Sequence, residues 1–174
     1  MNRATLIYLP LAIPAIVAAF YTFQVLSKAG LFIFIHDTFG VAIIATHVLM
    51  AVPFFTILFT NLNASENIDE LRNLARTLGG SVYQVESKVA IPILLRKAFP
   101  TIVLYFIFIL GSYEIPLLLG RQYPQMISVL IIRKLQRFNL LDIPTAYAMA
   151  VLYLIITATM IVLLFRKRKL SYDI

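Results

Sequence analysis

The chain has 174 residues, of which 61% are hydrophobic and 13% are charged, and its mean hydropathy is +0.90. A soluble globular domain is near half apolar and about a quarter charged, so this composition predicts a protein whose solvent is lipid. The absence of cysteine excludes disulfides, thiolate nucleophiles and cysteine-based metal sites, and the net charge of +7 lies in short segments beside apolar runs, which indicates membrane topology rather than nucleic-acid binding.

The first predicted element is a membrane span over residues 4–27, a charge-free run long enough to cross a bilayer as a helix. Pro10 and Pro14 lie inside it and are tolerated there because neighbouring helices cover the carbonyls that proline leaves free. A cleaved signal peptide is the alternative, with Arg3 before the apolar run and a cleavage site after Ala19.

A second span is predicted over residues 39–62, and it carries the first ionisable candidates. His47 lies in the middle of the span, where a charged group is costly. We interpret it as a neutral histidine satisfied by a neighbouring helix, and a role in a polar path through the membrane is the alternative. His36 and Asp37 lie at the outer end, where a pair with access to water is ordinary and a metal site is the alternative.

The segment over residues 63–97 is long for a connector and is patterned. Apolar residues recur on one face of residues 66–78, with acids early and arginines later, as suits the helix dipole. Gly79 and Gly80 are predicted to end this helix.

A second short helix is predicted in the same segment. Ser81 and Gln84 have the spacing of a capping box, which starts a helix. The helix is predicted to end by Ala90 and Ile91 because Pro92 restricts the residue before it. An ordered, amphipathic loop of this length predicts a docking surface.

A third span is predicted over residues 98–119, and it contains one acid, Glu114. Gly111 and Pro116 flank this residue, so a kinked backbone is expected there. A carboxylate that faced lipid would be costly, so Glu114 is predicted to face the bundle interior or water. The alternative is a structural role, in which Glu114 bonds to a neighbouring helix or pairs with Arg121.

The last elements are an interfacial helix and a fourth span. Apolar residues share one helical face of residues 121–141, and Arg133 and Arg137 share another, which predicts a helix lying in the headgroup region after Pro124. Contact with a partner outside the membrane is the alternative for this segment. The fourth span is predicted over residues 142–165.

The positive charges in the short loops indicate the orientation of the four spans. If the N-terminus is cytoplasmic, that side holds ten lysines and arginines and the other side holds five. Both termini are therefore predicted to be cytoplasmic. The ten are Arg3, Arg72, Arg76, Lys88, Arg96, Lys97, Arg166, Lys167, Arg168 and Lys169, and the five are Lys28, Arg121, Arg133, Lys134 and Arg137.

Motifs that carry chemistry are absent from the sequence. There is no G-x-x-x-x-G-K-[ST] phosphate loop, no HExxH zinc motif and no nucleophile beside a base, so neither an ATPase nor an intramembrane enzyme is predicted, and no catalytic residue, cofactor or metal site is expected. The predicted fold is an all-α, polytopic membrane helical bundle of about four spans plus short cytoplasmic helices, forming one domain over residues 1–174.

The stretch "NLARTLGGSVYQVESKVAIP" resembles the signature loop of the permease subunits of binding-protein-dependent ABC importers. In that family the signature is Glu-Ala-Ala, then Gly, then Ile-x-Leu-Pro at fixed spacing. Gly79 and the final pair Ile91-Pro92 fall in register, as do Ala75 and Val89. Asn73 and Leu74 replace the Glu and the first Ala, which weakens any contact that the Glu would make.

Other segments are similar to the same family. "LPLAIPAIVAAF" resembles the start of its third span, and "VPFFTILFTNL" resembles the span that leads into the signature loop. "GSYEIPLLLGRQYPQMISVLI" resembles the subgroup that imports polyamines, ferric iron, thiamine or similar small charged solutes. The chain is therefore expected to begin at the family's third span, as a fragment, a late translation start or a shortened permease.

The resemblance implies a transport subunit of the cell inner membrane that forms the path of a small solute. Its implied partners are a separate ATP-binding subunit, a second permease subunit, an extracytoplasmic solute-binding protein and membrane lipid. The implied ATPase-coupling residues are Asn73, Leu74, Ala75, Gly79, Val89, Ile91 and Pro92, and Glu114 and His47 are the candidates for the solute path. A channel or membrane assembly subunit without an ATPase is the alternative, and it predicts a short, passive loop instead.

Overall fold

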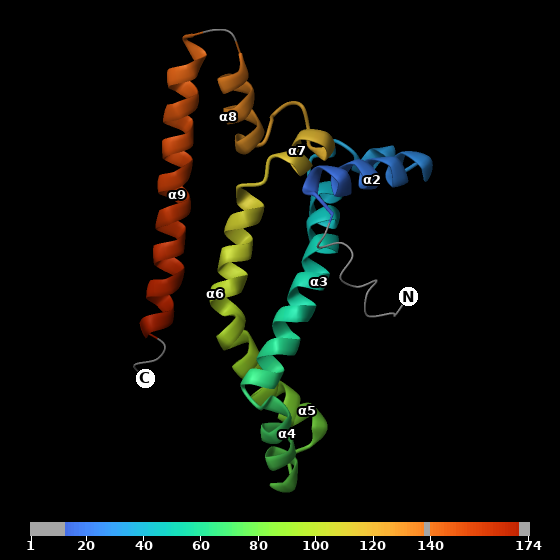
Figure 1. The fold of residues 1–174 in the computed structure, drawn as a ribbon, viewed down its shortest axis with the longest axis vertical. Coiled ribbons are helices and arrows are strands. Elements are labelled where there is room, and N and C mark those ends of the chain that lie inside the picture. The colour runs from blue at the N-terminus through green and yellow to red at the C-terminus, as the bar shows by residue number, and fades with distance from the viewer. Residues whose placement is uncertain (1–12, 138–139, 171–174) are drawn as a thin grey trace.

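The computed structural model describes residues 13–137 and 140–170, and the regular elements in these ranges are all helices (Figure 1). This confirms the all-α fold class. The elements in chain order are α2 (Ala15–Lys28), the 3-10 turn η2 (Phe32–Phe34), α3 (Val41–Ser65), α4 (Ile68–Thr77), α5 (Val82–Val85), the π-helical turn η3 (Glu86–Ala90), α6 (Ile91–Leu110), α7 (Glu114–Leu119), α8 (Ile127–Gln136) and α9 (Asp142–Leu170).

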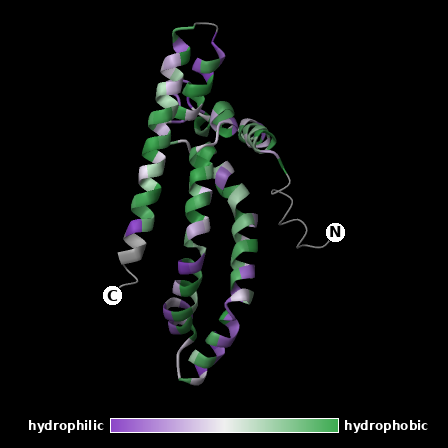
Figure 2. Ribbon diagram, turned by 60° about the vertical axis from the view of Figure 1, so that its left-hand side comes forward, coloured by the Kyte–Doolittle hydropathy of each residue, from purple (hydrophilic) through white to green (hydrophobic). Residues whose placement is uncertain are grey.

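Three helical segments of the described chain are long and apolar enough to cross a membrane: Val41–Ser65, Val82–Leu110 and Asp142–Arg166. Each of the two 25-residue segments is about 38 Å long at the rise of an α-helix, which exceeds the roughly 30 Å of a bilayer's hydrocarbon layer. Figure 2 shows that apolar residues dominate along these helices and that hydrophilic residues gather toward their ends. The polytopic, all-helical fold class is thereby confirmed, and the three candidate spans overlap the second, third and fourth predicted spans.

The first predicted span, residues 4–27, is described only in its second half. There the chain forms α2, whose 14 residues are about 21 Å long and do not cross a bilayer by themselves. Figure 1 shows α2 lying crosswise to α3, α6 and α9. It is held there by a small apolar core between α2, α3 and α7, made of Ala19, Ala42, Ile43, Ile115 and Leu119. Residues 4–12 lie outside the described part of the chain.

The third span begins and ends earlier than predicted. α5, η3 and α6 run on from one another, so the prediction that the second loop helix ends by Ala90 and Ile91 is wrong. Ile91 has helical torsions, φ −61° and ψ −47°, although Pro92 follows it. The wide π-helical turn directly before Pro92 relieves the crowding that a proline ring causes against the preceding turn. At the other end, α6 stops at Leu110 and the chain breaks before α7.

The predicted interfacial helix is present as α8, but it does not lie across the spans. Figures 1 and 2 show α8 beside the first part of α9 and roughly parallel to it. Val129 and Ile131 of α8 are buried, and the Nζ atom of Lys134 lies 2.9 Å from a carboxylate oxygen of Asp142, the first residue of α9. This packing explains the difference from the prediction, because an apolar helix face finds a partner in α9 instead of the headgroup region.

The two ends of the bundle carry different elements. α4, α5 and the C-terminal end of α9 lie toward one end, and α2, α7 and α8 lie at the other (Figure 1). The loop over residues 63–97 and the C-terminal end of α9 therefore lie toward the same end of the bundle (Figure 1). The positive charges predict that both are on the same side of the membrane. Which of the two sides is cytoplasmic stays a prediction.

Candidate functional site: the α4–α5 loop and the α6–α7 break

α4 ends in a turn that suits glycine. Gly79 has a φ of +88°, in the region that residues with a side chain rarely adopt. Its N–H donates to the carbonyl of Arg76 at 2.9 Å, and the N–H of Gly80 donates to the carbonyl of Ala75 at 3.1 Å, which is the hydrogen-bond pattern of a Schellman cap. A Cβ atom on Gly79 would meet no other atom within 4 Å. Within this chain, glycine is thus required at this position for its backbone conformation and not for space.

The next two residues set the angle between α4 and α5. A Cβ atom on Gly80 would lie 2.8 Å from the carbonyl oxygen of Ala75 and 3.0 Å from a methyl of Val85, so there is little room for a side chain between the end of α4 and α5. The N–H of Gln84 donates to the hydroxyl of Ser81 at 3.3 Å, and the N–H of Ser81 donates to the side-chain oxygen of Gln84 at 3.2 Å. The predicted capping box is confirmed.

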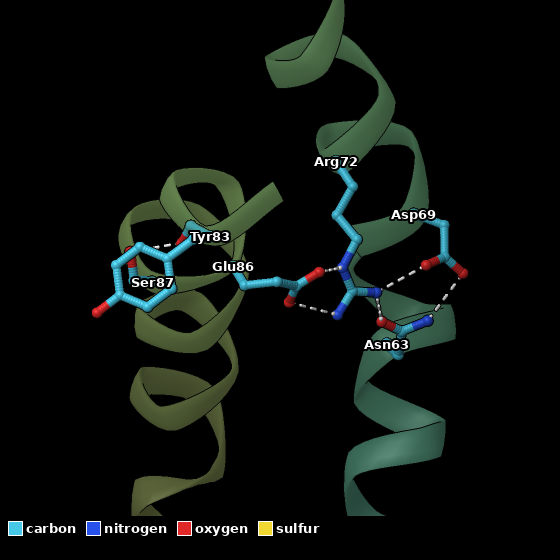
Figure 3. A network of polar contacts seen from close by, with 6 residues as sticks. All are labelled: Asn63, Asp69, Arg72, Tyr83, Glu86 and Ser87. Carbon is cyan, nitrogen blue, oxygen red and sulfur yellow. Dashed lines mark hydrogen bonds and ion pairs between the residues drawn. The ribbon is translucent and has the colours of Figure 1, made fainter. Parts of the chain in front are cut away.

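One arginine on α4 joins three segments of the chain (Figure 3). Arg72 donates two hydrogen bonds to the carboxylate of Glu86 in η3, at 2.8 and 3.1 Å. A further nitrogen of Arg72 donates at 2.7 Å to the amide oxygen of Asn63, in the last turns of α3, and at 2.7 Å to Asp69 on α4 itself. Asn63 in turn donates to Asp69 at 2.9 Å. We refer to Asn63, Asp69, Arg72 and Glu86 as the Arg72 network.

The Arg72 network shifts the pKa values of two of its members, Asp69 and Arg72. Hydrogen bonds from Arg72, and then from Asn63, hold the pKa of the Asp69 carboxyl below its usual range. The hydrogen bond to Glu86, followed by the one to Asp69, raises the pKa of Arg72. The side chain of Asp69 is 73% exposed whereas that of Glu86 is 34% exposed, so water screens the pair within α4 more than the pair that crosses to η3.

A second ion pair and a small apolar core support the same loop. The Nζ atom of Lys97 on α6 lies 2.9 Å from a carboxylate oxygen of Glu66, the residue after α3. Ile68, Val85 and Ala90 are at most 2% exposed, and they bring one buried side chain each from α4, α5 and η3. The loop is therefore an ordered body and not a slack connector.

Beyond this core, the far end of the loop exposes large apolar side chains. Leu78 is 88% exposed and Tyr83 is 82% exposed, and Leu74 and Val82 are more than half exposed. α4 also carries charged residues, with Asp69 and Glu70 in its first turn and Arg76 in its last. We call Leu74, Leu78, Val82 and Tyr83 the apolar tip.

The structure separates the implied coupling residues into two groups. One group is on α4 and the turn after it: Asn73 and Leu74 are exposed, Ala75 is partly buried, and Gly79 forms the turn. The other group is where the chain turns toward the membrane: Val89 is partly buried in η3, and Ile91 and Pro92 are exposed at the start of α6. Only the first group lies beside the apolar tip.

His47 is buried against the break between α6 and α7. It is 6% exposed, its Nδ1 lies 2.9 Å from the carbonyl oxygen of Ile43, and its Nε2 lies 3.1 Å from the hydroxyl of Ser112. Since a carbonyl can only accept, Nδ1 donates to Ile43, and Nε2 is paired with the hydroxyl of Ser112. The structure therefore shows His47 satisfied by a neighbouring segment, as the sequence interpretation expects.

The same residues border a cleft of about 250 Å³ at the break. Its lining is mostly apolar, and its polar side chains include His47, Ser112 and Tyr153. The hydroxyl of Tyr153 on α9 donates to the carbonyl of Leu110 at 2.6 Å, which satisfies one of the backbone groups that the end of α6 leaves free. The break thus holds backbone and side-chain polar groups, and His47 among them is buried.

Glu114 is the first residue of α7 and is partly buried. The predicted alternative, an ion pair between Glu114 and Arg121, is not formed: among the residues that the structure describes, Arg121 donates instead to the hydroxyl of Thr38 at 3.3 Å. Ser112, which contacts the ring of His47, and Glu114 are separated only by Tyr113, so one short stretch of chain carries Glu114 and contacts His47.

The His36-Asp37 pair has local structural roles. The Nδ1 of His36 hydrogen-bonds the carbonyl oxygen of Gly120, and its N–H donates to Leu119 at 3.0 Å. The carboxylate of Asp37 accepts from the N–H groups of Phe39 and Val41 at 3.1 and 2.9 Å, which caps the start of α3. Within residues 13–137 and 140–170, no group of three metal-binding side chains is found.

The sequence interpretation missed the Arg72 network and the Lys97–Glu66 pair. Arg72 and Glu86 are 14 residues apart, so no helical spacing connects them. The one available signal was compositional, because Glu86 and Lys97 are charged residues close to the start of an apolar span, where an unpaired charge is unusual.

A protein-family model described as binding-protein-dependent transport system inner membrane component matches residues 4–169 of the chain. No curated protein and no solved structure matches the chain. The family match extends from before α2 to the end of α9, so it includes the α4–α5 loop and the α6–α7 break.

Proposed function

Because the chain belongs to the family of binding-protein-dependent transport system inner membrane components, we propose that the apolar tip is the surface on which the ATP-hydrolysing subunit of its transporter docks. The protein is a multi-pass permease component of an ABC transport system of the inner membrane. The permease family has no ATPase activity itself and works with an ATPase and a binding protein. A channel or assembly subunit without an ATPase does not fit this membership.

The exposure of the tip carries the docking proposal. Leu78 and Tyr83 are more than four-fifths exposed, at the end of a loop that projects beyond α3 and α6 (Figure 1). The helix that leads to the tip carries charged residues in its first and last turns, so we assign this end of the loop to water, where contiguous apolar surface marks an interaction site. Asn73 and Leu74, the first of the proposed coupling residues, extend the same surface along α4.

The tip can be tested by placing a charge on it. Leu78→Glu should lower co-purification of the ATPase subunit by about thirtyfold or more, because a central apolar contact is worth about 2 kcal/mol or more in an interface. Leu140→Glu is the matched control, since Leu140 is 79% exposed at the opposite end of the bundle. Equal ATPase recovery with Leu78→Glu and with the wild type would contradict the docking assignment.

We further propose that the α6–α7 break lies on the solute path and that Glu114 favours a small cationic solute, such as a polyamine. The support is the partly buried carboxylate beside a helix break, together with the resemblance of its surroundings to the polyamine-like and iron-like subgroup. A carboxylate at such a place attracts cations and disfavours anions. His47, whose two ring nitrogens both have hydrogen-bond partners, would help to shape this path.

The family membership and the arrangement of the helices also support proposals for the remaining partners and for the orientation in the membrane. A second permease subunit would cover apolar faces that are open in the single chain, and a solute-binding protein would dock at the end that carries α2, α7 and α8. The α4–α5 loop and the C-terminus are assigned to the cytoplasm. Cysteine labelling tests this in a chain without native thiols: Ser81→Cys should resist a membrane-impermeant reagent in intact cells, and Gln122→Cys should react. The reverse pattern would invert the topology.

A further inference from the structure

The ties in the α4–α5 loop connect segments that could otherwise move separately. Arg72 and Glu86 join α4 to η3, Arg72 and Asn63 join α4 to α3, and Lys97 and Glu66 join α6 to the corner between α3 and α4 (Figure 3 shows the first two). Both membrane helices that bracket the loop are therefore fastened to its short helices. Of the apolar tip, Leu74 is on α4, Leu78 directly follows α4, and Val82 and Tyr83 are on α5.

The corner between α3 and α4 is the place where such fastening is needed. Asn67 separates the two helices and has a φ of +50°, a left-handed conformation that asparagine tolerates better than most residues. A single left-handed residue provides little resistance to bending. Apart from the polar ties, α4 is held by one small core, in which Ile68 is its buried residue.

We propose that Arg72 is a positioning residue for coupling, which acts by bracing α4 against η3 through Glu86. A displacement of the tip then moves η3 and α6 with it, because η3 continues into α6 without interruption. Without the brace, α4 bends at Asn67 and the displacement is absorbed inside the loop. The inference rests on the proposed docking of the ATPase at the tip and assigns a separate role to residues behind the tip.

The bidentate geometry suits a brace better than a charge contact. Two parallel hydrogen bonds fix both the distance and the relative orientation of the guanidinium and the carboxylate. The side chains of Arg72 and Glu86 are only 22% and 34% exposed, so they are less available to a docking partner than the tip residues are. The brace therefore transmits a movement and does not bind the ATPase.

Two matched glutamates test the brace in the assembled transporter. Glu86→Ala should reduce ATP-driven uptake about five- to tenfold, within the range by which single residues alter coupling between sites, while the ATPase subunit co-purifies at the wild-type level. Glu70→Ala is the control, because Glu70 is an exposed glutamate on α4 that makes no ion pair within the described residues. It should leave uptake within about twofold of the wild type.

A covalent tether separates bracing from folding in one preparation. The double variant Arg72→Cys with Glu86→Cys introduces the only thiols in the chain, and a short bis-maleimide can join them. Uptake should be low in the unlinked protein and return to within about twofold of the wild type once the link has formed. A linked protein that stays inactive would overturn the proposal.

The outcomes for ATPase binding distinguish the two proposals. If Glu86→Ala loses ATPase co-purification in proportion to uptake, Glu86 belongs to the docking surface and the brace is wrong, while docking at the loop stands. If Glu86→Ala and Glu70→Ala behave alike, the brace is also wrong. If Leu78→Glu leaves ATPase recovery unchanged, it is the docking assignment that fails.

Discussion

Substitution of Gly79 tests which property of glycine the turn after α4 requires. Substitution by alanine adds a Cβ atom at a φ of +88°, with no neighbouring atom within 4 Å. The cost is therefore conformational, and for a residue with a side chain in left-handed backbone it is about 1–2 kcal/mol. This corresponds to a factor of about 5–30 in the equilibrium between the closed and the opened turn.

Hydrogen exchange of the backbone amides in the turn measures the equilibrium between its closed and opened forms. In the Schellman cap, the N–H groups of Gly79 and Gly80 are bonded to Arg76 and Ala75, so these amides exchange when the turn opens. Gly79→Ala should raise the exchange rate in the peptide around the turn by about 5–30-fold and leave the amides of α3 and α6 unchanged. Gly79→Asn should raise it less, because asparagine tolerates left-handed backbone.

Two variants make the reasoning refutable. An exchange rate in Gly79→Ala equal to that of the wild type would show that the positive φ is not what glycine supplies. If uptake falls further with Asn than with Ala, side-chain size against a partner decides at this position, not backbone conformation. Gly80→Ala is the steric counterpart, because its Cβ atom would lie 2.8 Å from the carbonyl oxygen of Ala75 and 3.0 Å from a methyl of Val85, so the turn between α4 and α5 must shift.

Three further predictions follow from the break and from the Arg72 network. Glu114→Gln should reduce uptake of a cationic solute about tenfold at unchanged protein level, because one favourable charge is removed from a partly buried path. Undiminished uptake would show that Glu114 has no electrostatic role in transport. Ser112→Ala should lower the free energy of unfolding by about 1–3 kcal/mol, because the buried Nε2 of His47 loses its partner, and an unchanged melting midpoint in detergent would contradict this. The pKa of Asp69 is lower in the folded loop than in the unfolded chain, so the stabilisation that its carboxylate provides is complete above about pH 4 and is lost as the pH falls through the folded pKa. Hydrogen exchange of α4, corrected for intrinsic rates, should therefore accelerate at acid pH in the wild type. It should not accelerate in Asp69→Asn.

Local chemistry in the loop was predictable from the sequence. The capping box of Ser81 and Gln84 and the glycine turn at Gly79 involve residues within one helical turn of each other, so their spacing alone carries the signal. The apolar spans were predictable for the same reason, since hydropathy sums over neighbours. Pro92 shows the limit of a local rule, because a π-helical turn upstream removed the clash on which the rule depends.

Contacts between distant segments were not predictable in this way. The apolar run that contains α2 has the hydropathy of a span, yet α2 lies crosswise because Ala19 packs against residues of α3 and α7 far along the chain. The partners of His47 and Arg72 are likewise set by the packing of whole helices, 65 and 14 residues away in the sequence. A single sequence indicates that such polar groups need partners, but only the fold determines which ones they have.

The length of α9 has a consequence for the membrane around the protein. Its apolar segment is about 8 Å longer than the hydrocarbon layer it must fit, so it meets a hydrophobic mismatch that tilting relieves. Tyr153 fastens α9 to the end of α6, and Phe165 contacts Phe99 of α6 near the other end, with ring centres 6.1 Å apart. A thinner or thicker bilayer that changes the tilt of α9 must therefore change the inclination of α6 as well.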